Sequence, residues 1–345
     1  MSLQQIFQQA IQNNASDVHI IVGKPPILRI QGQLKAIKAE AEVTTELAKK
    51  MILEILSEQQ KEKLLKDREL DTSYETPDKT RFRINCYFEK GNLGLVARII
   101  PAKIPSMEEL LMPEIVYNLT RQNQGLILLT GPTGCGKSTS LAAMINLINT
   151  ERSATIVTLE DPTEFIFQPI KSIIKQRQVG IDTISFSDGL KHVFRQDPDV
   201  IMVGEMRDLE SIATTLTLAE TGHLVFATLH TNNAAQTVDR IIDVFPPHQQ
   251  DQVRFQLAMV LSGVIAQQLL PKADGGRIAA REIMINTPAV ANLIRENKVA
   301  QIKSIIQTSA DKEMTTMDQD LEKLYGQKLI TKEVANMYMV DGKTK

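Results

Sequence analysis

The strongest chemical signal in the chain is a glycine-rich loop, GPTGCGKST, at residues 131–139. It fits the phosphate-binding pattern G-x-x-x-x-G-K-[ST] through Gly131, Gly136, Lys137 and Ser138. Backbone N–H groups of such a loop can surround a β-phosphate, and the following helix N-terminus favours an anion. Lys137 can reach the β- and γ-phosphates, and the Ser138 hydroxyl can bind Mg²⁺. The loop therefore predicts a site for ATP and Mg²⁺, made by Gly131, Pro132, Thr133, Gly134, Cys135, Gly136, Lys137, Ser138 and Thr139.

Polar residues end three later strand-like runs. Glu160 and Asp161 follow TIVTL, Glu205 follows VIMVG, and His230 follows LVFATL. Because ligands of parallel sheets bind at the carboxyl ends of the strands, we expect these side chains to lie near the loop. Hydrolysis of ATP needs a group that orients or deprotonates water, ligands for Mg²⁺ and a contact to the γ-phosphate.

Glu205 is the first candidate for the residue that activates water, because a strand would project it from the edge of the sheet. In the common Walker B pattern an aspartate stands where this chain has Gly204. We therefore expect Mg²⁺ to depend on Ser138, water and an adjacent carboxylate. Glu160 is the first candidate for that carboxylate and Asp161 the second; the alternative is that both simply end a strand.

Two histidines and an arginine accompany these carboxylates. His230, at the carboxyl end of its strand, is the candidate contact to the γ-phosphate. His223 lies near the start of the same run, an odd number of residues before His230. On one strand this separation puts the two side chains on opposite faces, and His223 is expected to be structural. Arg207, beside Glu205, either contacts nucleotide or forms a salt bridge between subunits, and the sequence leaves both alternatives open.

The second half of the chain alternates strand-like runs with helical patterns. Strands are expected at GLILLT (125–130), TIVTLE (155–160), VIMVGE (200–205) and HLVFATLH (223–230), and helices from Lys137, Ser187 and Asp208. This alternation is typical of βαβ units and predicts a mostly parallel sheet covered on both faces. Another helix is expected after Thr287, with Thr287 as its N-cap and Pro288 at its first position.

Residues 1–100 predict a smaller α+β unit. A short helix is expected at 2–14 and one long amphipathic helix at 44–68. Strands are expected at 18–23 and at 26–37, the second with a turn at Gln31-Gly32. Residues 81–89 and 91–100 are expected to form a hairpin. Three prolines in PAKIPSMEELLMP (101–113) indicate a linker. We therefore expect domains at 1–100 and 114–286, followed by a helical region at 287–345.

Length and composition exclude several classes of protein. A chain of 345 residues suggests two domains, and its net charge of −2 argues against a dedicated nucleic-acid binder. Cys86 and Cys135 show no spacing typical of a disulfide framework or a zinc site, which favours a reducing, cytoplasmic setting. No apolar run approaches the roughly 18 residues of a membrane span, and the N-terminus does not resemble a signal peptide. Any membrane association is expected to come through a partner.

The order of these motifs resembles that of a known family. GPTGCGKST, LEDPTEF (159–165), RQDPDVIMVGEMRD (195–208) and TGHLVFATLHTNNA (221–234) are similar to the Walker A, Asp, atypical Walker B and His boxes of the secretion ATPase superfamily. Within this superfamily the chain resembles the PilT-type pilus retraction ATPases. The resemblance rests on the segments ASDVHI (15–20) and AVANLIRE (289–296) and on the absence of a tetracysteine motif. The chain departs from that pattern at Cys135, usually serine, and at Val290 and Ala291 of the C-terminal signature.

The resemblance implies a fold, an activity and partners. It implies an α/β chain with an N-terminal PAS-like α+β domain and a RecA-like P-loop ATPase domain followed by C-terminal helices. It also implies a homo-hexameric bacterial ATPase at the cytoplasmic face of the inner membrane, acting on a platform protein to retract pili. Arginines of a neighbour's N-terminal domain complete the nucleotide site in such motors, and the candidates here are Arg81, Arg83 and Arg98. Each of them is otherwise an ordinary arginine of a solvated strand edge.

Other functions fit some of the same residues. An assembly or secretion motor of the same superfamily shares the chemistry and has the opposite output. A RecA-like nucleic-acid translocase shares the core, although the charge balance disfavours it. A nucleotide-binding scaffold without turnover is a third alternative, against which Glu205 and Lys137 argue. The helices that include AVANLIRE are expected either to couple the motor to its partner or to form a cap on the ATPase domain.

Overall fold

The computed structural model describes residues 2–30, 32–37, 41–100 and 103–340. Gln31 of the predicted turn and residues 101–102 of the predicted linker lie outside the described residues. The chain divides into two units, Met1–Lys103 with Pro162–Ile166, and Ile104–Asp161 with Phe167–Lys345. Each unit is described by itself.

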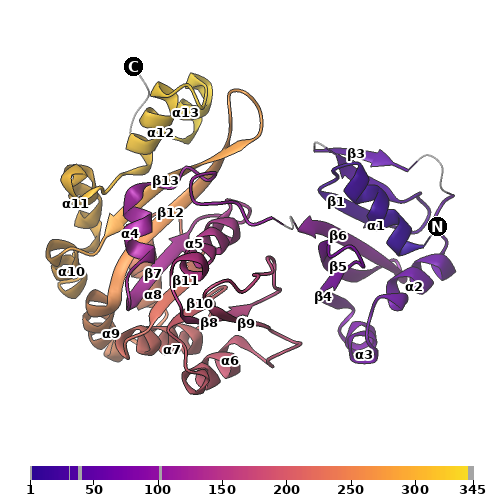
Figure 1. Ribbon diagram of the computed structural model, residues 1–345, viewed down its shortest axis with the longest axis horizontal. Coiled ribbons are helices and arrows are strands. Elements are labelled where there is room, and N and C mark those ends of the chain that lie inside the picture. Colours follow the sequence, from indigo (N-terminus) through magenta and orange to yellow (C-terminus); the bar gives the residue numbers. More distant parts are fainter. Residues whose placement is uncertain (1, 31, 38–40, 101–102, 341–345) are drawn as a thin grey trace. The chain divides into compact units, whose positions relative to one another are not determined.

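The first unit is an antiparallel sheet with helices packed against it (Figure 1). Its helices are α1 (Leu3–Gln12), α2 (Thr45–Glu54) and α3 (Glu58–Asp67). Its strands are β1 (Asp17–Ile20), β2 (Ile27–Ile30), β3 (Gln33–Ala36), β4 (Glu69–Glu75), β5 (Arg81–Glu89) and β6 (Asn92–Ile100). The strands pair in the order β3-β2-β1-β6-β5-β4. This arrangement confirms the predicted α+β class of the unit.

Alternation along the strands gives this sheet one buried face. Phe82 and Ile84 of β5 are fully buried, and the ring of Phe82 stacks on Phe7 of α1 with 4.1 Å between centroids. The predicted hairpin is confirmed, because β5 and β6 pair antiparallel and turn through Lys90 and Gly91, both at positive φ. The opposite face of β5 and β6 carries the polar members of each strand.

The single helix predicted at 44–68 is wrong, since the segment forms two helices. Ser57 begins α3 with a capping box: its side chain accepts a hydrogen bond from the N–H of Gln60, whose side chain in turn bonds the Ser57 N–H. Arg68 then ends α3 in the left-handed conformation, with φ 65°. β4 follows at once from Glu69, and this strand of the sheet was not predicted.

The second unit is built on a larger sheet that is parallel except for one strand. Its strands are β7 (Gly125–Thr130), β8 (Thr155–Glu160), β9 (Ile173–Gln178), β10 (Val200–Val203), β11 (Leu224–Leu229), β12 (Leu261–Pro271) and β13 (Arg277–Ile285). They pair in the order β13-β12-β7-β11-β10-β8-β9, and only β13 runs antiparallel to its neighbour. All six residues of β7 are buried, as expected for a strand covered on both faces.

Helices connect and cover these strands. They are α4 (Glu114–Thr120), α5 (Lys137–Glu151), α6 (Phe186–Val193), α7 (Leu209–Glu220), α8 (Ala234–Asp243), α9 (Pro247–Val260), α10 (Pro288–Arg295), α11 (Ile302–Thr308), α12 (Met317–Gly326) and α13 (Lys332–Tyr338), with short 3₁₀ turns at Phe194–Gln196, Val299–Gln301 and Ala310–Lys312. The expected starts at Lys137 and Pro288 are confirmed; the helix expected from Ser187 starts one residue earlier, and Asp208 is the N-cap of α7. Strands β9, β12 and β13 and helices α4, α8 and α9 were not predicted.

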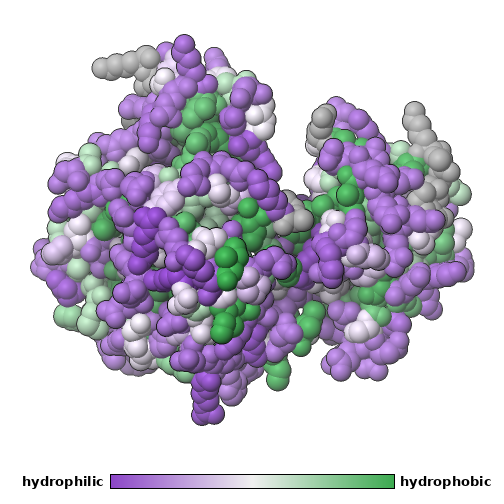
Figure 2. Space-filling model, in the orientation of Figure 1, coloured by the Kyte–Doolittle hydropathy of each residue, from purple (hydrophilic) through white to green (hydrophobic). Residues whose placement is uncertain are grey.

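The surface agrees with this arrangement of buried cores. Figure 2 shows mostly hydrophilic residues on the visible face, with hydrophobic residues in separate small groups. Within the described residues, no helix combines the length and the apolar character needed to cross a membrane.

Candidate nucleotide site

The glycine-rich loop joins the buried end of β7 to the first residue of α5. Gly131, Gly134 and Gly136 all have positive φ, at 137°, 80° and 90°. A Cβ atom on Gly131 would lie 2.3 Å from the carbonyl oxygen of Gln267, so only glycine fits there. The loop therefore has the tight, left-handed turns that expose backbone N–H groups to a phosphate. This cradle fits the β-phosphate of a nucleotide.

Lys137 supplies the positive charge of the loop. Its side chain is buried, and its ammonium group donates hydrogen bonds to the carbonyl oxygens of Gly131, at 2.7 Å, and Pro132, at 3.1 Å. Ser138, the next residue, is exposed at the start of α5. The ammonium group is thus held inside the loop, at the place where a bound phosphate would supply a stronger, charged acceptor.

The loop has a second support that the sequence analysis missed. Gln267 of β12 donates from Nε2 to the carbonyl oxygen of Cys135, at 2.6 Å, and its Oε1 accepts from the Ser140 hydroxyl, at 2.9 Å. Burial raises the pKa of the Cys135 thiol, so this departure from the family pattern acts as a small neutral side chain. One feature of the sequence could have indicated the role of Gln267: it forms, with Gln268, a polar pair inside the otherwise apolar run at 263–270.

Glu205 lies at the centre of a polar cluster at the ends of β10 and β11. Its Oε2 accepts from Arg207 Nε, at 2.8 Å, and its Oε1 lies 3.1 Å from His230 Nε2. The Thr228 hydroxyl donates to the carbonyl oxygen of Gly204, at 2.5 Å, which extends the contact between the two strands beyond Val203. The structure therefore brings Glu205 and His230 together, as a site built at strand ends requires.

Arg207 links this cluster to the neighbouring strand β8. Its Nη1 lies 3.8 Å from Asp161 Oδ2, in addition to the bond to Glu205. The sequence left two alternatives for Arg207, a contact to nucleotide and a salt bridge between subunits. Its pairs with Glu205 and Asp161 within one chain were not among them. Arg207 thus holds two of the candidate carboxylates at one edge of the sheet.

Glu160 lies at the same edge but is enclosed by its neighbours. It is buried, and its Oε1 accepts hydrogen bonds from Thr158, at 2.7 Å, and from Gln176 Nε2 of β9, at 3.0 Å. Within the described residues, no group of three histidine, cysteine or acidic side chains could hold a metal ion by itself. The roles of Ser138 and Glu160 toward Mg²⁺ stay predictions.

His223 has the structural role that its position predicts. Its Nδ1 lies 2.9 Å from the carbonyl oxygen of Leu218 and 3.1 Å from the Thr221 hydroxyl, both at the end of α7. The ring therefore closes the helix end before β11 begins.

The three candidate arginines lie on one face of the N-terminal sheet. Arg83 of β5 stands opposite Arg98 of β6, and Arg81 is two residues from Arg83. Arg98 Nε donates to Asp17 Oδ1, at 2.9 Å, and Arg81 Nη2 donates to the Ser73 hydroxyl, at 2.8 Å. Arg83 Nη1 lies 3.4 Å from Glu164 Oε1, in the segment 162–166 of the same unit. Their face is opposite to the one that α1 covers.

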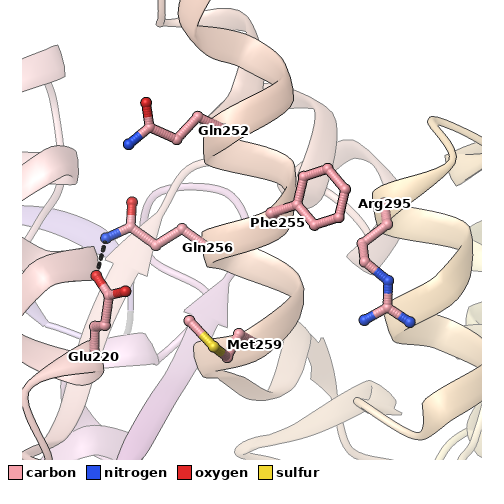
Figure 3. Close-up of a pocket in the computed structure, with 6 residues that line it drawn as sticks. All are labelled: Glu220, Gln252, Phe255, Gln256, Met259 and Arg295. Atoms are coloured by element: carbon pink, nitrogen blue, oxygen red, sulfur yellow. Dashed lines mark hydrogen bonds between the residues drawn. The ribbon is translucent and has the colours of Figure 1, made fainter.

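A groove on the second unit includes part of the AVANLIRE segment. Figure 3 shows Phe255 of α9 beside Arg295 of α10, and Met259 of α9 on the side of Glu220 of α7, which accepts a hydrogen bond of 2.7 Å from Gln256. Phe255 and Met259 are 61% and 67% exposed. Val290 and Ala291, the departures from the family signature, are buried instead, and α10 therefore presents one face to the core and Arg295 to the groove.

Comparisons with known proteins agree with the geometry of the loop and the strand ends. A family model described as type II/IV secretion system protein matches residues 1–291. The type IV pilus retraction ATPase PilT of Pseudomonas aeruginosa is 44% identical over 335 residues, which cover 97% of each chain. A twitching motility protein of Neisseria gonorrhoeae is 47% identical over 311 residues, covering 90% of this chain and 83% of its own.

The fold of the chain also matches that of a solved relative. A crystal structure of the pilus retraction motor PilT with bound ADP superposes with a TM-score of 0.92, at 46% identity, and covers 99% of this chain and 98% of that one. The N-terminal unit, the P-loop ATPase unit and the C-terminal helices thus occur together in a solved relative. The chain belongs to the type II/IV secretion system protein family and, within it, to the pilus retraction ATPases.

Proposed function

We propose that this protein is a homo-hexameric, Mg²⁺-dependent ATPase that powers type IV pilus retraction from the cytoplasmic face of the inner membrane. The observation that carries the proposal is the pairing of Glu205 with His230 at the strand ends of the same sheet that carries the loop with Lys137. A nucleotide cradle alone binds ATP, whereas a carboxylate with a basic partner adds the group that hydrolysis needs. The name of the Pseudomonas aeruginosa relative and the ADP bound in the solved PilT structure support the same activity.

Each residue of the site has a proposed part in turnover. The backbone of the loop and Lys137 bind the β- and γ-phosphates. The Ser138 hydroxyl would hold Mg²⁺, and the ion would supply positive charge to the phosphate oxygens. Glu205 orients the attacking water and accepts its proton at a carboxylate oxygen. His230 contacts the γ-phosphate, and it also keeps the Glu205 carboxylate in place through the 3.1 Å contact.

The arginine face of the N-terminal sheet supports an assembly in which neighbouring subunits share the site. Arg81, Arg83 or Arg98 of one subunit reaches the nucleotide of the next and stabilises the charge that develops on the transferred phosphoryl group. ATP binding closes such an interface, and hydrolysis with phosphate loss releases it, so that chemistry is converted into movement between subunits. The movement acts on a platform protein in the inner membrane, and the groove at Arg295 is a surface through which α10 takes part in this coupling.

The test is a strain in which the gene is deleted. Loss of a retraction motor is expected to leave excess surface pili that do not shorten, and the wild-type gene is expected to restore retraction. A gene carrying Lys137→Ala is expected to produce a folded protein without restoring it. Loss of surface pili after the deletion would instead identify an assembly or secretion motor, and would contradict the proposal.

A further inference from the structure

Gln267 and Arg281 form a buried polar pair on the hairpin of β12 and β13. The two residues stand directly opposite each other in the antiparallel register, and Arg281 Nε donates to Gln267 Oε1, at 3.3 Å. They are only 2% and 3% exposed. Polar groups at this depth need specific partners, because desolvation is costly for an amide and more so for a charge. The partners of this pair lie in two different parts of the chain.

On one side the pair holds the phosphate loop. Gln267 Nε2 donates to the Cys135 carbonyl oxygen, and a Cβ atom on Gly136 would lie 3.0 Å from the same nitrogen. Gln267 Oε1 also accepts from Ser140 in the first turn of α5. The amide of Gln267 therefore fixes the end of the loop and the beginning of the helix, the part that binds a phosphate.

On the other side the pair holds the segment that enters this unit from the N-terminal part of the chain. Arg281 Nη2 donates to the Leu110 carbonyl oxygen, at 2.9 Å, and Nη1 to that of Leu111, at 3.3 Å. Both belong to a tight turn at residues 106–112, in which Leu111 has a positive φ of 50°. We call this segment the entry turn.

One buried guanidinium group thus bonds the entry turn and, through Gln267, the phosphate loop. Burial lowers the pKa of Arg281 to about 10, and the group stays charged at neutral pH. The backbone N–H of Arg281 is itself held by Asp320 Oδ2 of α12, at 2.8 Å. A shift of the entry turn would therefore leave a buried charge without its acceptors unless Arg281 and Gln267 moved with it.

We propose that Gln267 and Arg281 are positioning residues that couple the entry turn to the phosphate loop, so that nucleotide binding and the position of the segment leading to the N-terminal domain depend on each other. The inference rests on the nucleotide site described above. The pair would connect the phosphate loop to the linker within one subunit, so that nucleotide binding at the loop affects the position of the linker. Neither residue needs to touch the nucleotide.

The first test compares two substitutions on adjacent residues of β12. Gln267→Glu keeps the shape and gains an ion pair with Arg281, but it replaces the donor to Cys135 by an oxygen that repels the carbonyl group. Gln268→Glu adds the same charge one residue along the strand, on the other face, where the side chain is half-buried and its Oε1 has no hydrogen-bond partner among the described residues; it therefore controls for burying a charge without removing a bond to the loop. With purified full-length protein, Gln267→Glu is expected to raise the KM for ATP at least about tenfold with kcat changed much less, and Gln268→Glu to leave both near wild type.

The second test measures hydrogen exchange at the entry turn. The amides of Leu110, Leu111 and Met112 are bonded within the turn, to Ser106, Glu108 and Met107, so their exchange reports on it. ADP is expected to change their exchange in the wild-type protein and in Gln268→Glu, and to change it much less in Gln267→Glu or Arg281→Lys at saturating nucleotide. Arg281→Lys keeps the charge but not the fork that reaches both carbonyls.

The outcomes separate this inference from the proposed function. If the wild-type protein binds nucleotide but ADP leaves the exchange of the entry turn unchanged, or if Gln267→Glu has the KM of Gln268→Glu, the coupling is contradicted and the ATPase assignment stands. If the wild-type protein binds no nucleotide, the proposed function is contradicted instead.

Discussion

Two adjacent carboxylates, Glu160 and Asp161, show how differently neighbouring residues can be placed at one strand end. Glu160 is 6% exposed and accepts bonds from Thr158 and Gln176, whereas Asp161 is exposed and faces Arg207. Position at the carboxyl end of a strand was enough to predict that both lie near the site. It was not enough to predict their partners, because Gln176 comes from β9, a strand that the sequence did not indicate.

The metal role assigned to Glu160 can be separated from that of Asp161 by titrating Mg²⁺. Glu160→Gln keeps an oxygen that can accept from Thr158 and removes the negative charge. If Glu160 supports the metal, the Mg²⁺ concentration for half-maximal ATP turnover is expected to rise about tenfold, while Asp161→Asn shifts it less than about twofold. The reverse pattern in the two titrations would move the role to Asp161.

At the scale of elements, periodicity predicted the strands and helices that carry the motifs. β7, β8, β10 and β11 are apolar runs bounded by turns, and each was placed by its own sequence. The hairpin of β12 and β13 was not, because its apolar runs contain Gln267, Arg281 and Glu282, whose buried polar groups have partners far away in sequence. Local patterns cannot show such partners, and the site residues on this hairpin were missed for the same reason.

Glu282 of β13 supports an element of the site and gives a prediction about pH. Its Oε1 accepts from the N–H of Ala234, at 2.8 Å, at the first residue of α8, which follows the His230 loop. Burial raises the pKa of Glu282 above the ordinary value of a glutamate, although this backbone bond and the charge of Lys303 oppose the shift. A raised pKa means that the carboxyl stabilises the fold fully below its unfolded pKa and loses that contribution as pH rises through the folded pKa.

Glu282→Gln keeps the acceptor oxygen and removes the charge, so its effect on stability is expected to depend on pH. The difference in Tm, variant minus wild type, is expected to increase as pH rises above the ordinary pKa of a glutamate, and thermal unfolding at a series of pH values measures it. Glu296→Gln, on an exposed carboxylate paired with Lys298, is the control and is expected to show no such increase. A pH-independent difference for Glu282→Gln would contradict the burial of its charge.

At the scale of the whole molecule, the arginine face predicts that subunits complete each other's sites. Arg83→Ala is expected to reduce turnover by about 10³ or more, and Glu205→Gln by at least about 10². Mixed rings contain interfaces in which an intact Glu205 meets an intact Arg83 of the neighbour, so mixing the two inactive proteins is expected to restore part of the ATPase activity. No recovery in rings shown to contain both variants would place Arg83 outside the neighbouring site.

Arg81→Ala and Arg98→Ala belong in the same mixing experiment. Arg98 donates to Asp17, whose carboxylate is only 5% exposed, so Arg98→Ala is also expected to lower the Tm. Arg83 contacts Glu164, whose side chain is 33% exposed, and Arg83→Ala is therefore expected to lower turnover without a comparable loss of stability.

The most direct test of the account is phosphate release by the purified full-length protein with Mg²⁺ and ATP, measured beside binding of a fluorescent ATP analogue. The wild-type protein is expected to release phosphate, Lys137→Ala neither to bind nor to hydrolyse, and Glu205→Gln to bind ATP while releasing phosphate at least about 10² times more slowly. Absence of phosphate release by the wild-type protein, or near-wild-type release by Glu205→Gln, would contradict the claim that this cluster hydrolyses ATP.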